Sequence, residues 1–402
     1  MKSRNLLFYS LCTVPLSVQA VEPFPYQTEN GIDIIPTLQF SAGHDDNVRR
    51  TETDPVDSAM YRVTPKVVAQ LETRRSAYQF DYTLDAVSFT DSSEDDYVNH
   101  ELHGNAFWLF DIRHRLRLDY TYRVASEARG TGLTEGSSLQ VDEPLRFRRH
   151  DANARYMYGA NGAPGRLVGI LGYEAKDYDD EVFVRTNGVT VDTKFYNWDM
   201  PYVAGEFYYA VSSYFHALTI FRHEIRSYDN LFTGPGGSRD NNNTFLYGGL
   251  DWDVTGKTQG RLLLGFQNKD FDSDQRENFQ GFSWQLRLSW KPTDYSEFRL
   301  EGRDFARDPN LNADYVEDQS IKIDWEHKWT PLVTTTASAR YGTNDYPGIR
   351  KDDDTQFDVS ATYSIARWWD VTAGVSWFER DSTLTGYSYD QTRFFLGMEV
   401  SL

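Results

Sequence analysis

The sequence predicts an all-β fold, a transmembrane antiparallel up-and-down β-barrel of about 18 strands. Three observations predict it. Apolar and polar residues alternate with period two along most of the chain, and the apolar face is rich in Trp, Phe and Leu. The polar face carries full charges, which a packed protein core does not tolerate unpaired. The same two-strand unit recurs along the chain, as expected for strands with lipid on one side and water on the other.

The clearest unit is residues 282–302, FSWQLRLSWKPTDYSEFRLEG. Every second residue from Phe282 to Trp290 is apolar or aromatic, and the residues between them are polar. The alternation breaks at Pro292 and resumes with Phe298 and Leu300 on one face. This pattern predicts two amphipathic strands joined by a tight turn.

The composition agrees with a barrel. The mean hydropathy of the 402 residues is -0.61, and no run of 18 apolar residues follows the N-terminus, which excludes helical spans. Only alternate residues of a barrel strand meet lipid, so a negative mean hydropathy is compatible with one. The chain holds 26 Tyr, 25 Phe and 10 Trp, as aromatic girdles at both membrane interfaces require.

The first residues predict export from the cytoplasm. Residues 1–20 have a basic start with Lys2 and Arg4, an apolar middle and a small-residue cleavage site at Ala20, and so predict a signal peptide. Cys12 lies inside it, which leaves the mature chain without cysteine. Residues 21–31 are expected to be an irregular periplasmic segment, and residues 32–402 the outer-membrane barrel.

The net charge restricts the partners. The formal charge of -19 falls to about -21 once Lys2 and Arg4 are removed with the signal peptide. Binding of nucleic acid needs a basic surface, so nucleic acid is excluded as a partner.

Turn signals divide the chain into strands. Short breaks alternate with longer ones, which predicts tight turns at one end of the barrel and loops at the other, with both termini in the periplasm. The short breaks fall near 72–75, 111–114, 160–165, 211–213, 255–258, 291–294, 330–331 and 366–368. The longer breaks fall near 45–57, 90–96, 127–144, 179–195, 227–242, 272–277, 305–313, 343–353 and 381–389. These breaks separate 18 strands.

The segment 197–210 fits least well. Trp198, Met200 and Tyr202 set a register in which Glu206 points at lipid. A charge there costs about 2–4 kcal/mol at the bilayer centre, so we expect a bulge or a register change. Without a regular strand here the count becomes 16.

The last strand, Arg393 to Leu402, resembles the C-terminal signal by which the barrel-assembly machinery recognises barrel proteins. The usual final residue is aromatic, whereas here it is Leu402.

No catalytic pattern stands out. The chain lacks a Gly-rich phosphate loop and an HExxH motif, and we expect neither an enzyme nor a cofactor or metal site. Asp270, Asp272 and Asp274 have the spacing that begins a calcium loop, but Gln275 replaces the glycine of the sixth position. Such acidic runs are interpreted as solvated loop tips, or as groups that bridge divalent cations to lipopolysaccharide.

Inward positions are predicted to be polar throughout and to carry many arginines. Cross-strand ion pairs that stabilise the wall are one interpretation. A locally basic path for an acidic polymer or a small anion is the other. The candidate path residues are Arg115, Arg117, Arg123, Arg155, Arg261, Arg287, Arg299, Arg303, Arg340, Gln285 and Tyr247.

The Trp-bearing strands, such as Leu286–Trp290 and Ile321–Trp325, resemble those of the outer-membrane β-barrel porins of bacterial exopolysaccharide and capsule clusters. The resemblance covers about residues 32–402. It implies a channel of the Gram-negative outer membrane, surrounded by lipid and lipopolysaccharide. It also implies export of an exopolysaccharide or capsular polysaccharide with a periplasmic polysaccharide-export or co-polymerase partner.

Two other functions fit the same barrel. The first alternative is a passive or solute-specific diffusion porin, with one long loop folded inward; the candidate loops are 127–144, 179–195 and 227–242. The second is a structural or adhesive barrel whose lumen is filled by side chains.

Overall fold

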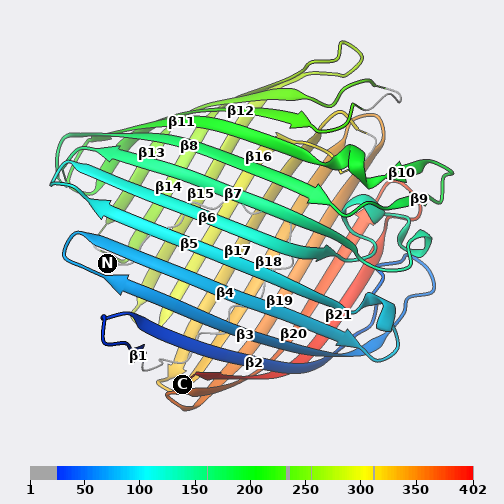
Figure 1. The fold of residues 1–402 in the computed structure, drawn as a ribbon, viewed down its shortest axis with the longest axis horizontal. Coiled ribbons are helices and arrows are strands. Elements are labelled where there is room, and N and C mark those ends of the chain that lie inside the picture. The colour runs from blue at the N-terminus through cyan, green and yellow to red at the C-terminus, as the bar shows by residue number, and fades with distance from the viewer. Residues whose placement is uncertain (1–24, 161, 232–235, 255, 311–312, 402) are drawn as a thin grey trace.

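The computed structural model describes residues 25–160, 162–231, 236–254, 256–310 and 313–401. The expected signal peptide 1–20 lies outside these residues. The described chain forms one closed antiparallel β-barrel of 18 long strands, which confirms the predicted fold class and excludes 16 strands (Figure 1). The barrel strands are β2 (Asp33–Asp45), β3 (Ser58–Glu72), β4 (Ser76–Phe89), β5 (Tyr97–Leu109), β6 (His114–Glu127), β7 (Leu145–Tyr158), β8 (Gly165–Tyr178), β11 (Trp198–Ala210), β12 (Phe215–Tyr228), β13 (Asn241–Val254), β14 (Thr258–Phe271), β15 (Phe279–Thr293), β16 (Ser296–Arg307), β17 (Val316–Thr330), β18 (Val333–Tyr346), β19 (Arg350–Ala366), β20 (Trp369–Ser382) and β21 (Tyr389–Ser401).

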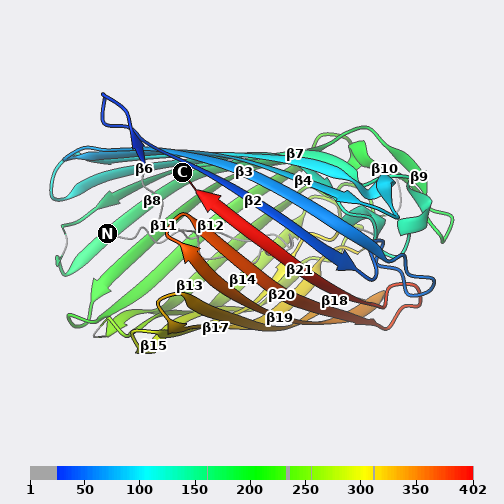
Figure 2. The same ribbon diagram turned by 90° about the horizontal axis from the view of Figure 1, so that it is seen from below.

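The first and last strands close the barrel. β2 pairs with β21 from Thr37 opposite Ser401 to Asp45 opposite Arg393, and every other barrel strand pairs with its neighbours in sequence. β1 and the last residues of β21 lie at the end of the barrel that carries the short turns, which we call the turn end (Figures 1 and 2). The opposite end carries the longer connections, and we call it the loop end.

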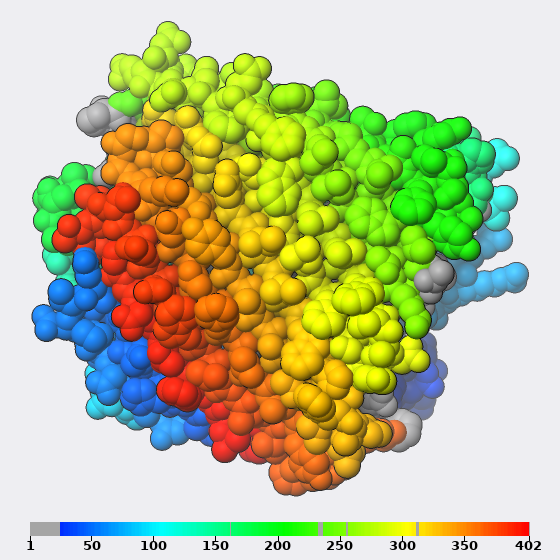
Figure 3. Space-filling view, turned by 180° about the vertical axis from the view of Figure 1, so that it is seen from behind, coloured from blue at the N-terminus to red at the C-terminus, as the bar shows by residue number. Residues whose placement is uncertain are grey.

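Side chains alternate between the two faces of the wall. On β15, Phe282 and Trp290 are about half exposed on the outer face, whereas Ser283 is buried inside. The outer surface of the second half of the chain is an unbroken layer of side chains (Figure 3). Lipid covers such a surface in a membrane, so apolar residues that are exposed here are expected.

The smaller elements lie at the two ends. The strands β9 (Val182–Val184) and β10 (Thr190–Asp192) form a hairpin at the loop end, and the helices are short 3-10 turns. No described helix is long and apolar enough to cross a membrane. Part of the segment expected to be irregular forms a strand, because β1 (Tyr26–Gln27) pairs with the start of β2.

The prediction of a long connection at 343–353 is wrong. β18 and β19 stay paired up to Tyr346 opposite Arg350, and only residues 347–349 form the turn, with Gly348 at φ +68°. The polar run indicates a loop by composition alone. In the structure, Asp352 is buried inside the barrel and pairs with Arg350, which satisfies its charge.

The register expected for 197–210 is also wrong, and so is the expected bulge. β11 pairs with β8 without interruption from Trp198 to Tyr209. Glu206 faces the interior, where its carboxylate pairs with Arg155 at 2.5 Å. The residues that face lipid are therefore the odd-numbered ones, such as Phe207.

Aromatic residues of the same strand point inward because arginines of β12 cover their rings. The guanidinium of Arg222 lies 3.8 Å from the ring centroid of Tyr202, and that of Arg226 lies 4.0 Å from that of Trp198. Stacked guanidinium groups stabilise aromatic rings in a polar interior.

The inner face is not polar throughout, contrary to the prediction. Inward side chains of neighbouring strands from β7 to β14 pack into an apolar cluster with Phe305 of β16. The buried members are Val168, Tyr208, Leu218, Phe245, Tyr247 and Leu263. This part of the interior is filled by side chains.

Candidate functional site

All eleven predicted path residues lie at inward-facing positions. Most of the arginines have carboxylate partners on the same strand or a neighbouring one, except that Arg155 of β7 reaches across β8 to Glu206 of β11. These pairs are Arg117 with Asp119, Arg123 with Glu101, Arg155 with Glu206, Arg261 with Asp251, Arg299 with Glu297 and Glu326, and Arg303 with Asp318. Arg115 donates to the carbonyl oxygen of Gly159 at 2.6 Å. Arg287, Arg340 and Gln285 lie on the inner faces of β15 and β18.

Exposure divides these residues into two groups. The side chain of Arg123 keeps 37% of its exposure although it points into the barrel, and its partner Glu101 keeps 45%. Water therefore reaches the inner face of β5 and β6. Tyr247 is buried in the apolar cluster, where its hydroxyl lies 2.7 Å from that of Ser283. Tyr247 thus packs the wall and offers little surface to a solute.

One long loop crosses the loop end of the barrel. Residues 128–144 follow β6, and Glu135 near the middle of this loop contacts β19 and β20, which are seven and six strands away from β6 around the wall. A carboxylate oxygen of Glu135 lies 2.5 Å from Arg350 and another lies 3.4 Å from Arg380. The segment was among the three candidate constriction loops, and the structure places it across the mouth.

Further contacts fix the middle of the loop. Arg185, from the β9–β10 hairpin, donates to the Glu135 carbonyl oxygen at 2.5 Å and to the Tyr387 hydroxyl at 2.8 Å. The guanidinium of Arg350 stacks between the rings of Tyr346 and Tyr387, 4.1 Å and 4.0 Å from their centroids. The β9–β10 hairpin, the start of β19 and the connection between β20 and β21 therefore come together around Glu135.

The start of the loop is fixed as well. Arg129 is buried and donates two hydrogen bonds to Asp95, at 2.7 Å and 2.5 Å. Glu127 accepts a hydrogen bond from the backbone N–H of Leu133 at 2.7 Å. Gly132 has φ +55° and its Cα lies against the Glu127 carboxylate, so a side chain at this position would clash.

Electrostatics keeps Glu135 ionised. Burial alone would raise the pKa of this carboxyl, but the facing Arg380 and Arg350 guanidinium groups outweigh it and lower the pKa below its ordinary value. Glu135 is therefore a carboxylate at neutral pH and binds both arginines as an ion.

Sequence reasoning missed Glu135, Arg350 and Arg380. All three are charged residues at or near predicted loops, and that pattern is typical of solvated surface. The one signal in the sequence is that Glu135 lies near the middle of a long candidate loop. The sequence does not say which part of the wall that loop reaches.

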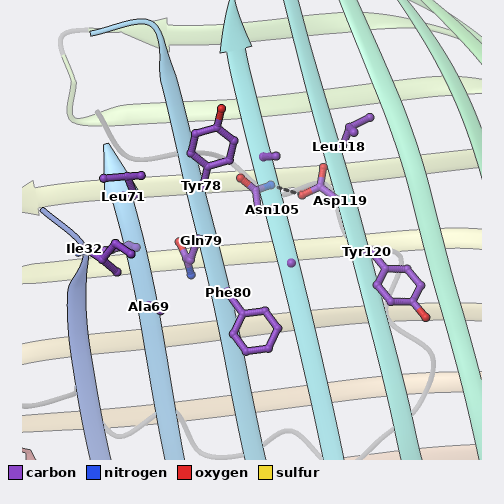
Figure 4. A pocket seen from close by; sticks show the side chains of 13 residues that line it. Ile32, Ala69, Leu71, Tyr78, Gln79, Phe80, Asn105, Leu118, Asp119 and Tyr120 are labelled. Atoms are coloured by element: carbon purple, nitrogen blue, oxygen red, sulfur yellow. Dashed lines mark hydrogen bonds between the residues drawn. The ribbon is translucent and has the colours of Figure 1, made fainter. Parts of the chain in front are cut away.

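A separate depression of about 460 Å³ lies on the outer wall of β3 to β6 (Figure 4). Its rim is formed by apolar side chains such as Leu71, Phe80 and Leu118, and its floor is open because Gly104 and Ala106 carry little or no side chain. The outer face of these strands meets lipid in a membrane.

The acidic loop residues are the candidates for cation binding. Within the described residues, no three His, Cys, Asp or Glu side chains come together as a metal ion requires. Asp270 accepts a hydrogen bond from Asn268.

Comparisons with known proteins agree with this architecture. The family model described as "Putative beta-barrel porin 2" matches residues 33–402. None of the curated proteins matches the sequence.

Solved structures share the fold at low identity. The copper transporter OprC is 9% identical, with 92% of this chain and 81% of that chain covered and a TM-score of 0.51. The outer membrane protein opdK from Pseudomonas aeruginosa is 12% identical, with 92% and 99% covered and a TM-score of 0.48. The siderophore receptor PirA from Acinetobacter baumannii is 8% identical, with 92% and 80% covered and a TM-score of 0.47. The family match covers nearly the whole chain, and the chain therefore belongs to this β-barrel porin family and forms a porin-like barrel of the outer membrane.

Proposed function

We propose that this protein is a diffusion porin for small solutes, in which loop 128–144 forms the constriction. The observation that carries the proposal is the contact of Glu135 with Arg350 and Arg380 on the far side of the mouth. A loop held across the mouth narrows the opening, and an 18-strand wall is otherwise wide enough for an aqueous channel.

The water-accessible Arg123–Glu101 pair supports the same function, because it places solvent inside the barrel below the loop. The apolar cluster along β7 to β14 fills part of the interior and so narrows the space that is left for water. A narrow path of this kind suits small solutes better than a polymer.

The test uses purified barrel in planar lipid bilayers and in liposomes. We expect stepwise single-channel currents and swelling of liposomes in small sugars that stops above a size limit. A variant lacking residues 131–138 should raise that limit, whereas Glu143→Gln, an exposed change in the same loop, should leave it unchanged. Barrels that insert but neither conduct nor admit sugars would contradict the proposal.

Export of an exopolysaccharide or capsular polysaccharide stays a prediction. It rests on the resemblance of the hairpins alone, and so does the periplasmic export partner. The barrel-assembly machinery as a partner rests on the resemblance of the last strand to a C-terminal signal, and lipopolysaccharide on the location of the barrel in the outer membrane. Deleting the gene separates the two functions. Loss of surface polysaccharide with unchanged solute uptake would favour export, and the opposite result would favour the porin.

A further inference from the structure

The register of the barrel places four basic residues in one row across its inner face. Arg261 of β14 is directly opposite Arg287 of β15, and Lys322 of β17 is directly opposite Arg340 of β18. Glu301 of β16 lies between the two pairs. Residues opposite each other on neighbouring strands have Cβ atoms about 5 Å apart, so these side chains form a continuous band, which we call the cationic row.

Four acidic residues in or near the row are paired with basic residues, two of them with members of the row itself. Asp251, which begins the row on β13, accepts from Arg261 at 2.7 Å, and Asp324 lies 2.8 Å from Lys322. Closer to the loop end, Asp318 of β17 is paired with Arg303, and Asp354 of β19 is paired with Arg380.

Arg340 differs from the rest of the row. In the part of the chain that the structure describes, Arg340 has no carboxylate within 4 Å, and its side chain is only half-buried. Lys322, directly opposite Arg340, is paired with Asp324 at 2.8 Å, so of these two described residues it is Arg340 whose positive charge lacks a carboxylate within 4 Å.

We infer that the cationic row binds an oxyanion, a carboxylate or a phosphate, with Arg340 as the main contact, and that it makes the channel anion-selective. A guanidinium group donates two parallel hydrogen bonds to an oxyanion, and the ammonium group of Lys322, which is paired with Asp324, lies at the facing position. The inference rests on the proposed porin function and names its solute class. It also opposes the expectation from net charge, since a protein of charge -19 would by itself favour cations.

Two measurements test the row. The first is the reversal potential of single channels in a KCl gradient, with the wild type expected to prefer chloride. Arg340→Gln should lower this preference and Arg340→Lys should retain most of it. The matched control is Lys66→Gln, which removes one positive charge from the inner face of β3, away from the row. A cation-selective wild type, or equal effects of Arg340→Gln and Lys66→Gln, would overturn the inference.

The second measurement is calorimetric titration of the folded barrel in detergent with citrate and, separately, with phosphate. We expect binding of at least one, weakened about tenfold in Arg340→Gln, the loss expected for one charge-assisted hydrogen-bonded contact. Tighter binding of citrate assigns the carboxylate class, and tighter binding of phosphate assigns the phosphate class. Binding of neither by the wild type overturns the site.

The two measurements keep the proposals apart. A barrel that binds citrate without conducting current contradicts the porin function alone. A barrel that conducts with no change in Arg340→Gln contradicts the row alone. If Arg340→Gln does not fold, Arg287→Gln tests the same row from β15.

Discussion

The carboxylate of Glu135 lies 2.5 Å from the guanidinium of Arg350, although 215 residues separate them in sequence. Both residues are buried, and Arg350 also pairs with Asp352 at 3.0 Å. This contact joins a loop that follows β6 to the first residue of β19. It determines how much of the loop end is covered.

Glu135→Gln should release the loop from the wall. Removing one partner of a buried ion pair costs about 3–5 kcal/mol, more than a single loop contact can replace. We expect larger and noisier single-channel currents, with the barrel still folded. Glu143→Gln, exposed in the same loop, serves as the control. Identical currents in the wild type and both variants would show that Glu135 does not hold the constriction.

The same contact predicts a response to acid. Since Arg380 and Arg350 lower the pKa of Glu135 in the folded protein, the anchor is present above the ordinary carboxyl range and is lost as the pH falls through the lowered value. Conductance should stay constant from neutral pH down to about pH 4.3, the ordinary pKa of a Glu side chain, and rise only below it. Currents recorded stepwise from pH 7 downward check this. A rise near neutral pH would contradict the assignment to Glu135.

Two neighbouring residues of β15 test which face meets lipid. Leu286→Arg places a charge in lipid and should cost about 2–4 kcal/mol, whereas Gln285→Arg points the same side chain into the interior and should cost far less. Urea titration of barrels folded in liposomes measures both. Equal losses would mean that the two faces are assigned wrongly.

The orientation in the membrane can be tested with single cysteines. Gln275→Cys lies exposed at the loop end, and Ser213→Cys lies exposed at the turn end. In intact cells a membrane-impermeant maleimide should label the first and leave the second unlabelled, because long loops face outside. The reverse labelling pattern would show that the barrel has the opposite orientation in the membrane.

Gln267 predicts a stability effect. Its side-chain amide donates to the carbonyl oxygen of Ala306 at 2.6 Å and accepts from the Ala306 N–H at 2.7 Å, reaching over Gly281 of β15. Gln267→Leu leaves both backbone groups buried without a partner, at about 1–3 kcal/mol each. Gln259→Leu, on the same face near the turn end, is the control. Equal urea midpoints for the two variants would contradict this role.

The sequence by itself determined the barrel and the face of nearly every strand, and it predicted about 18 strands while leaving 16 open. The reason is local. Each strand of a barrel must offer apolar side chains to lipid at alternate positions, and this requirement leaves a period of two in the sequence. On β15 the alternation from Phe282 to Trp290 is complete, and the structure places these residues outside.

β11 shows where this local signal fails. Both of its faces carry large apolar or aromatic residues. The alternation of apolar and polar residues is therefore too weak to show which face is outside. Arg222 and Arg226 of the next strand, which cover Tyr202 and Trp198, decide the question. Those partners are recognisable only once the strands are paired.

Tertiary structure alone decided the contact of loop 128–144 with the far wall and the alignment of the cationic row. Glu135 and Arg350 meet because the loop spans the mouth, and the partner of a charge in a long loop is set by distance in space, not in sequence. Lys322 and Arg340 face each other because the pairing register of β17 and β18 aligns them. The period of two predicts which face of the wall a residue lies on. The position of the residue along the barrel axis, relative to residues of other strands, depends on the shear of the closed barrel, and only the paired strands show it.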